Sequence, residues 1–330
     1  MGRMLDGEWH TDAEMLEHDE GGEFEREETS FREWVEDDED ARFRPEAGRY
    51  HLYVSYACPW AHRALTTRAL LGLEDVISVD VVDPVRKDQG WEFAPEKEGC
   101  TPDSLFGHDY LRDVYTEADP DYTGRVTVPV LWDKKEETIV NNESEEIIKM
   151  FADAFDALGD RDVDLYPEGE REEIDEIIDD IYPSINNGVY RAGFADSQAA
   201  YERAVDELFE ALATYDDRLG EQRFLAGESL TLADVCMYTT LFRFDEVYHT
   251  HFKCNVKEIA DHENLQDYLR ELYQLPGVGE VSRIEHCKQH YYRSHEHLNP
   301  KTIVPVGPDY DLSEPHGRDS LPGELPADLA

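Results

Sequence analysis

A short β-strand followed at once by a cysteine, a proline and a helix is the feature that most constrains this chain. Residues 50–54 are a short run of mainly aromatic and aliphatic side chains that ends in β-branched Val54, as is typical of a strand. Cys58 and Pro59 follow, and residues 61–71 then carry apolar side chains at helical spacing up to Gly72, a common residue at a helix end. The pattern predicts that Cys58 lies at the junction of a strand and a helix.

A cysteine at such a junction has the properties of a nucleophile. The first N–H groups of a helix and its dipole stabilise an anion, which lowers the pKa of a thiol. Pro59 suits the first helical turn, where no N–H is needed. Position 61 is alanine, so no disulfide can form within the motif, and an external thiol must resolve an oxidised Cys58. A small buried residue at a tight junction is the alternative interpretation, but the Cys-Pro pair after a strand favours the nucleophile.

The pattern of elements along the chain indicates two folded domains. A strand at 76–82, a long irregular segment at 83–123, a hairpin at 125–140 and a helix after Ser144 complete the order of a thioredoxin fold. Apolar residues at helical spacing dominate after Glu168. We therefore expect an α+β thioredoxin-like domain followed by an all-α domain. The expected regions are an acidic N-terminal extension (1–45), a thioredoxin-like thiol-binding domain (46–160), an all-helical substrate domain (165–300) and a C-terminal tail (301–330).

Two further motifs suit a peptide-like thiol ligand. Val128-Pro129 begins a strand, where proline marks a strand end or edge, and in thioredoxin-like folds this proline is cis. Ser144 can cap the next helix, whose first N–H groups would hold a carboxylate, while Glu143 could bind an ammonium group. Together they fit the amino-acid end of a γ-glutamyl thiol. A plain edge proline and a plain helix cap are the alternatives.

Several long motifs in one order carry a family resemblance. Residues 48–308 resemble the Xi-class glutathione transferases, the glutathionyl-hydroquinone reductases. The motifs are 53–63 (Tyr-Val-Ser-Tyr-Ala-Cys-Pro-Trp-Ala-His-Arg), 124–133, 139–144, 186–194, 243–255 and 290–295.

The resemblance implies a role for each site residue. Cys58 would be the nucleophile, and three tyrosines would face the hydroquinone: Tyr190 as proton donor or acceptor, Tyr248 to help depress the thiol pKa, and Tyr291. The implied thiol-binding residues are Trp91, Arg125, Val128, Glu143 and Ser144. The residues alone support the tyrosines less well, since any one of the 18 tyrosines is more often a core aromatic.

Charge excludes some partners and indicates a habitat. The formal net charge is −46, with no basic run that could bind nucleic acid or an anionic membrane. So many like charges repel in dilute buffer, whereas in about 1 M salt the screening length falls to about 3 Å. The charge therefore indicates a halophilic protein. The N-terminus lacks the apolar stretch of a signal peptide, and we expect a cytoplasmic location.

The remaining expectations concern cofactors, partners and alternatives. The five cysteines are odd in number and irregularly spaced, which argues against a disulfide framework. The His and Cys residues at 249–254 and 286–290 match no zinc-finger spacing, so we expect no metal. We expect glutathione or γ-glutamylcysteine as co-substrate, an aromatic hydroquinone conjugate as substrate, and a homodimer. A conjugating or dehydroascorbate-type glutathione transferase and a non-catalytic transferase-like binding module are the alternatives.

Overall fold

The computed structural model describes residues 2–11 and 16–330, which form two compact units. The first unit contains residues 1–15, 27–161 and 285–303, and the second contains 16–26, 162–284 and 304–330. Residues 1 and 12–15, which belong to the expected N-terminal extension, lie outside the described part. No helix in the described ranges combines the length and apolarity needed to cross a bilayer.

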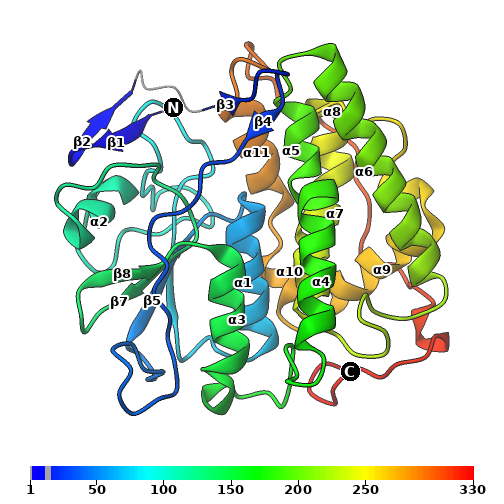
Figure 1. The fold of residues 1–330 in the computed structure, drawn as a ribbon, viewed down its shortest axis with the longest axis horizontal. Coiled ribbons are helices and arrows are strands. Elements are labelled where there is room, and N and C mark those ends of the chain that lie inside the picture. Colours follow the sequence, from blue (N-terminus) through cyan, green and yellow to red (C-terminus); the bar gives the residue numbers. More distant parts are fainter. Residues whose placement is uncertain (1, 12–15) are drawn as a thin grey trace. The chain divides into compact units, whose positions relative to one another are not determined.

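A mixed four-stranded sheet forms the centre of the first unit (Figure 1). The strands lie in the order β6-β5-β7-β8; β6 runs parallel to β5, and the other two pairs are antiparallel. Every residue of β5 is buried, in keeping with its mainly aromatic and aliphatic sequence. The bounds are β5 (Tyr50–Val54), β6 (Ser78–Val81), β7 (Val130–Asp133) and β8 (Thr138–Asn141).

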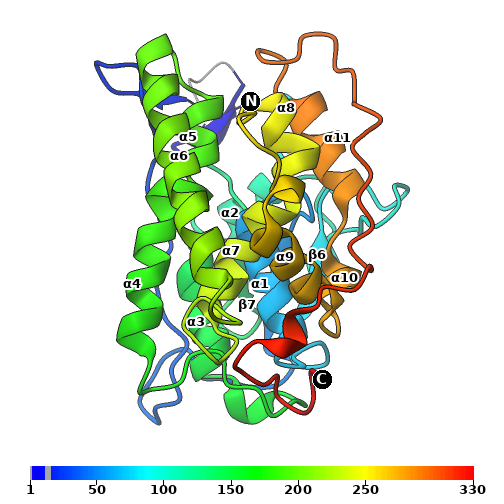
Figure 2. The same ribbon diagram turned by 90° about the vertical axis from the view of Figure 1, so that its right-hand side faces the viewer.

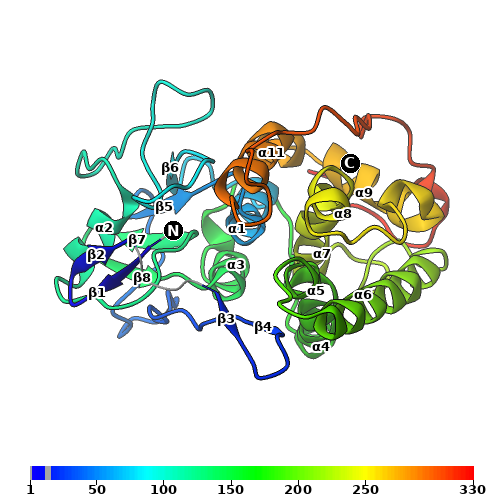
Figure 3. The ribbon, with the colours of Figure 1, turned by 90° about the horizontal axis from the view of Figure 1, so that it is seen from above.

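Helices from distant parts of the chain accompany this sheet. Helices α1 (Pro59–Leu70) and α3 (Ser144–Asp153) lie side by side (Figures 1 and 3). The segment 83–123, expected to be irregular, contains α2 (Leu111–Ala118), so that part of the prediction was wrong. The helix has only about two turns, which is too short for a clear helical periodicity. Its N-cap residue is Tyr110, whose side chain makes no capping hydrogen bond, so the sequence also lacks a signal for the start of the helix. Helix α11 (Ile284–Ser294) lies almost wholly in this unit.

The N-terminal segment is ordered where the structure describes it. In the first unit, β1 (Arg3–Leu5) and β2 (Glu8–His10) form an antiparallel hairpin, and the Met4 N–H donates to the Gly124 carbonyl at 2.9 Å. In the second unit, β3 (Glu17–His18) pairs with β4 (Phe24–Glu25).

The second unit is helical and is built around α7 (Leu232–Arg243), every residue of which is buried (Figure 2). The sequence Thr231-Leu232-Ala233-Asp234 has the pattern of a helix-initiating capping box, and the structure has that box at the start of α7. Helices α4 and α9 pack against α7, and α5 lies along α6. The remaining bounds are α4 (Arg171–Ile181), α5 (Gly188–Gly193), α6 (Gln198–Leu219), α8 (His249–His251), α9 (Glu263–Gln274), α10 (Val278–Val281), the π-helical turns η2 (Tyr182–Asn186) and η3 (Phe244–Tyr248), and the 3₁₀ turns η4 (Ile259–Asp261) and η5 (Arg318–Ser320), with η1 (Asp156–Leu158) in the first unit.

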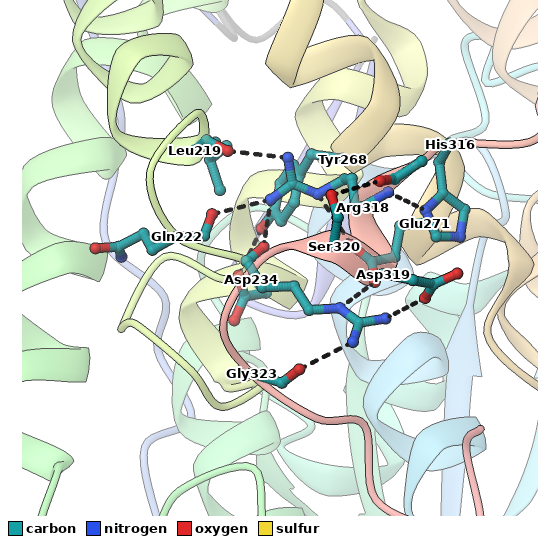
Figure 4. A network of polar contacts seen from close by, with 12 residues as sticks. Leu219, Gln222, Asp234, Tyr268, Glu271, His316, Arg318, Asp319, Ser320 and Gly323 are labelled. Atoms are coloured by element: carbon teal, nitrogen blue, oxygen red, sulfur yellow. Dashed lines mark hydrogen bonds and ion pairs between the residues drawn. The ribbon is translucent and has the colours of Figure 1, made fainter.

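The C-terminal segment is bound to this helical unit by a buried arginine (Figure 4). Arg318 Nε donates to Glu271 Oε2 at 3.0 Å, and its other nitrogens donate to backbone carbonyls, including that of Leu219 at 3.0 Å. Arg223 Nε donates to Glu271 Oε1 at 2.6 Å. Leu329 near the chain end is buried. Residues 304–330 are therefore an integral part of the second unit.

The same network contains a group of three potential metal ligands among the described residues: Glu271, His316 and Asp319. Two guanidinium groups already neutralise Glu271, and Arg223 also pairs with Asp319 at 2.9 Å. Because a metal cation would have to displace or oppose these charges, the group is better explained as the anchor of the C-terminal segment.

Candidate active site

Cys58 is the N-cap of α1, which confirms its predicted place at the start of the helix. Its backbone is extended, and its carbonyl accepts the first intrahelical hydrogen bond from the His62 N–H at 2.9 Å. Pro59 is the first helical residue. The half-buried thiol donates to the Val128 carbonyl at 3.5 Å, and the Val128–Pro129 peptide bond is cis as expected. The N-terminus of α1, with its N–H groups that lack intrahelical partners and the positive end of its dipole, therefore lies at Cys58.

Two arginines add positive charge to this region of the first unit. Arg86 interacts electrostatically with Cys58, and an anionic sulfur stabilises the arginine's charged form. Desolvation lowers the pKa of Arg86 to about 10, and the charge of Arg125 acts in the same direction. The attraction is reciprocal, so Arg86 favours the thiolate of Cys58. The sequence did not reveal Arg86, because it lies in the segment 83–123, where no motif or periodicity singles it out.

Trp91 forms part of an aromatic stack in the same unit. Its ring lies on the His290 ring, with centroids 5.2 Å apart and planes 17° apart, and Tyr291 meets His290 edge to face at 5.1 Å. The Arg86 guanidinium is 5.4 Å from the centre of the Trp91 ring. The buried Trp91 Nε1–H has no hydrogen-bond partner in residues 2–11 and 16–330. It is a donor available to a ligand, since buried indole N–H groups usually find a partner.

The start of α3 differs from the prediction in its capping residue. Glu143, whose backbone is extended, is the N-cap, and its carboxylate accepts from the Glu145 N–H at 3.5 Å. Ser144 is already the first helical residue; it is buried, and its hydroxyl donates to Glu143 Oε1 at 3.4 Å. The predicted serine cap was therefore wrong: both residue types can accept from a first-turn N–H, and the chain becomes helical one residue earlier than expected. Thr29 also donates to Glu143, at 3.3 Å.

Two of the three tyrosines meet in the second unit. Tyr190 and Tyr248 are buried, with ring centroids 6.0 Å apart. The Phe252 ring packs against both, with its centroid 5.4 Å from that of Tyr190 and 5.5 Å from that of Tyr248. The Arg26 guanidinium lies 4.9 Å from the centre of the Tyr190 ring. The third tyrosine, Tyr291, belongs to the first unit together with Cys58, Trp91, Arg125, Val128, Glu143 and Ser144.

The thiols of Cys254 and Cys100 lie in surroundings that disfavour the thiolate. Cys254 is fully buried and donates to the Val189 carbonyl at 3.9 Å; burial raises the pKa of its thiol far above the usual value. Burial, reinforced by the nearby Asp83 carboxylate, raises the pKa of Cys100 to about 11. None of the five cysteines forms a disulfide. Cys58 differs in standing at a helix N-terminus with an arginine beside it.

Comparison with known proteins places both units in one family. The model "Glutathione S-transferase, N-terminal domain" matches residues 57–154, and "Glutathione S-transferase, C-terminal domain" matches 198–271. The glutathionyl-hydroquinone reductase YqjG of Escherichia coli is 50% identical over 97% of this chain and 99% of its own length. The glutathionyl-hydroquinone reductase PcpF of Sphingobium chlorophenolicum is 49% identical over 94% and 98%.

Solved structures agree with this assignment. The Xi-class glutathione transferase of Natrialba magadii shares 60% identity, with a TM-score of 0.93 over 98% of both chains. The glutathione-bound structure of YqjG gives a TM-score of 0.88 at 49% identity over 97% of this chain and 99% of that one. The fold is thus the predicted thioredoxin-like domain with an all-α domain, and the chain is a glutathione-dependent enzyme that belongs to the Xi-class glutathione transferases, the family of the glutathionyl-hydroquinone reductases.

Proposed function

We propose that this protein is a glutathionyl-hydroquinone reductase with Cys58 as its nucleophile. The observation that carries the proposal is the position of Cys58 as N-cap of α1, with Arg86 favouring its anionic form. The absence of a cysteine at position 61 supports a one-cysteine mechanism with an external thiol. The names of YqjG and PcpF support the substrate class.

The reaction consists of two attacks by a thiolate on sulfur, the first on a thioether and the second on a disulfide. The Cys58 thiolate attacks the sulfur of a thioether that joins a γ-glutamyl thiol to a hydroquinone ring. The carbon–sulfur bond breaks, its electron pair stays on the ring carbon, and Tyr190 delivers a proton there. Cys58 is left as a mixed disulfide. A second thiolate attacks the γ-glutamyl thiol's sulfur in that disulfide and releases the Cys58 thiolate, which gives a low-molecular-weight disulfide. The thioether sulfur and one external thiol are thus joined in the oxidised product, the ring carbon is reduced, and the external thiol supplies the proton that restores Tyr190.

The first unit supplies the groups that would hold the thiol. Glu143 offers a carboxylate to the ammonium group of a γ-glutamyl residue, assisted by Ser144, and Arg125 offers a positive charge to a carboxylate. The backbone of Val128 would bind the cysteinyl part beside Cys58. Trp91, with its buried N–H that lacks a partner in the described residues, would donate to the ligand and cover it. No metal takes part in these steps.

The proposal also covers the location of the protein, its dependence on salt and its oligomeric state. All five cysteines carry thiols, which fits a reducing cytoplasm. The net charge of −46 fits a salt-rich one, so the protein should keep its circular dichroism spectrum in molar KCl and lose it in dilute buffer. We also propose that it works as a homodimer, with no metal. An unchanged unfolding temperature from millimolar to molar KCl would show that charge repulsion does not control stability.

A turnover assay tests the function and the identity of the thiol together. The purified protein is given glutathionyl-hydroquinone or its γ-glutamylcysteinyl analogue, with the matching thiol as reductant, and the free hydroquinone is measured. Release of hydroquinone with stoichiometric low-molecular-weight disulfide is expected from at least one pair. If neither conjugate is reduced, but the protein joins glutathione to electrophiles and still does so as Cys58→Ser, it is a conjugating transferase.

A further inference from the structure

The helical unit contains a cavity that takes no part in the proposed reaction. It measures about 420 Å³, within the range of about 300–1,000 Å³ typical of ligand sites. Its walls come from the end of α7, from η3, from α9 and from residues 309–312 of the C-terminal segment. Figure 2 shows that segment running past α9, to which it is bonded: Gln274 Nε2 donates to the Leu312 carbonyl at 2.8 Å.

The charge of the cavity wall is negative. Four carboxylates line it, and none of the described lining residues is Lys or Arg. The four are Asp245, Glu246, Asp309 and Asp311. Such a wall attracts a cation and repels an anion, and it is unsuited to a hydroquinone conjugate that carries carboxylates.

Asp245 is the deepest of these carboxylates. It is 7% exposed and accepts the N–H groups of Ile259 at 2.6 Å and Ala260 at 3.0 Å, which leaves lone pairs for a further donor. Burial raises its pKa to about 6 and the charge of Glu258 adds to the effect, against the two N–H groups and His249. The fixed groups around Asp245 therefore leave its negative charge incompletely compensated.

Aromatic rings form the apolar part of the wall. Phe242 and Tyr273 lie nearly parallel, with planes 10° apart and centroids 6.4 Å apart. Tyr310 is fixed by the hydrogen bond from its hydroxyl to Glu258 Oε2 at 2.8 Å. The face of an aromatic ring attracts a cation, and it suits an alkylated ammonium better than a strongly hydrated metal ion.

Gln266 gives an independent indication of a ligand. The residue is 7% exposed and lines the cavity, yet its side-chain amide makes no hydrogen bond within the residues that the structure describes. Its amide atoms are not sealed from solvent, so they are reached from the cavity and can exchange water for a ligand. A ligand with a polar group would satisfy this amide.

We propose that this cavity binds a small organic ammonium ion that carries a hydrogen-bonding group. The carboxylates would neutralise its charge, the rings would cover its methyl or methylene groups, and Gln266 would bond its polar group. The site is separate from the thiol chemistry, and its existence does not depend on the proposed function.

Choline is a suitable probe, with two control ligands. Tetramethylammonium keeps the charge and lacks the hydroxyl, and 3,3-dimethyl-1-butanol keeps the shape and lacks the charge. Each is titrated calorimetrically into the full-length protein in molar NaCl. Choline should bind saturably, tetramethylammonium more weakly and the neutral alcohol not measurably. No saturable binding of choline, or equal binding of the neutral alcohol, would overturn the proposal.

Variants locate the binding in the cavity. Asp309→Asn with Asp311→Asn removes two exposed charges and should weaken choline about fivefold. Tyr273→Leu should weaken it about two- to fivefold. Gln266→Leu should abolish the preference of choline over tetramethylammonium. Asp206→Asn with Asp217→Asn on the exposed side of α6 makes the same charge change elsewhere and should leave binding unaltered.

Two results would contradict this location or this ligand class. The first is an equal loss of choline binding in the α6 pair and the cavity pair, which would mean that only the net charge matters. The second is one-to-one displacement of choline when KCl replaces NaCl, which would make the site one for inorganic cations. The circular dichroism spectrum of each variant shows whether it is folded. If one of the three cavity variants does not fold, the other two still test the location of the site.

Discussion

Cys58 and Cys254 differ in the surroundings that control the pKa of a thiol. Cys58 stands at the N-terminus of α1 with Arg86 favouring its anion. Cys254 is enclosed by the helical unit, where its thiol faces the Val189 carbonyl and burial raises its pKa. Both are hydrogen-bonded to a backbone carbonyl, so that contact does not distinguish them. The helix N-terminus and the charge of Arg86 are what distinguish the surroundings of Cys58.

The contrast also divides the proposed chemistry between the units. In the proposed reaction, the first unit stabilises the Cys58 thiolate, which is the nucleophile. The second unit contributes the hydroxyl groups of Tyr190 and Tyr248, which lie in an aromatic cluster with Phe252. A tyrosine hydroxyl keeps its proton at neutral pH and can deliver it. Each variant below removes either a group that stabilises or carries the thiolate or the proposed proton donor.

Removal of the reactive thiol has the largest expected effect. Cys58→Ser should reduce hydroquinone release by several orders of magnitude, because a serine hydroxyl is a poor nucleophile without a base to activate it. Cys254→Ala is the matched control and should retain activity in the folded protein. Equal losses in the two variants would remove the distinction between the two thiols.

Tyr190→Phe should have the next largest effect, and only on the aromatic substrate. The loss of a positioned proton donor costs about 10²–10⁴-fold in rate. Reduction of a small mixed disulfide needs no protonation of carbon, so that activity should survive. If both activities fell together, the hydroxyl would serve Cys58 or the fold and not the ring carbon.

The sequence predicted those parts of the site that depend on local chain geometry. Cys58 at the helix start and the capping box at Thr231 follow from short patterns, and the structure has both. The cap of α3 was assigned one residue too late, since Glu143 and Ser144 can both cap. Arg86 acts on Cys58 across 28 positions of sequence, and no local pattern records such a contact.

Arg86→Gln should have the smallest of the three effects. Without this cation the pKa of Cys58 should rise by about one unit, which lowers the thiolate fraction about tenfold at pH values below both pKa values and by less near neutral pH. Arg86→Lys should restore much of the reactivity. Arg42→Gln, an exposed residue paired with Glu136, is the control for a lost positive charge. The account of Arg86 is wrong if its variant and the control alkylate equally fast.

The pH dependence of alkylation tests the central claim most directly. The folded protein in molar KCl is treated briefly with iodoacetamide across a pH series, and modification at each cysteine is measured by mass spectrometry. Cys58 should react fastest, with an inflection well below the value of about 8.5 for free cysteine, and Cys254 should remain almost unmodified. An inflection for Cys58 at or above 8.5, or equal rates at the two cysteines, would contradict the account.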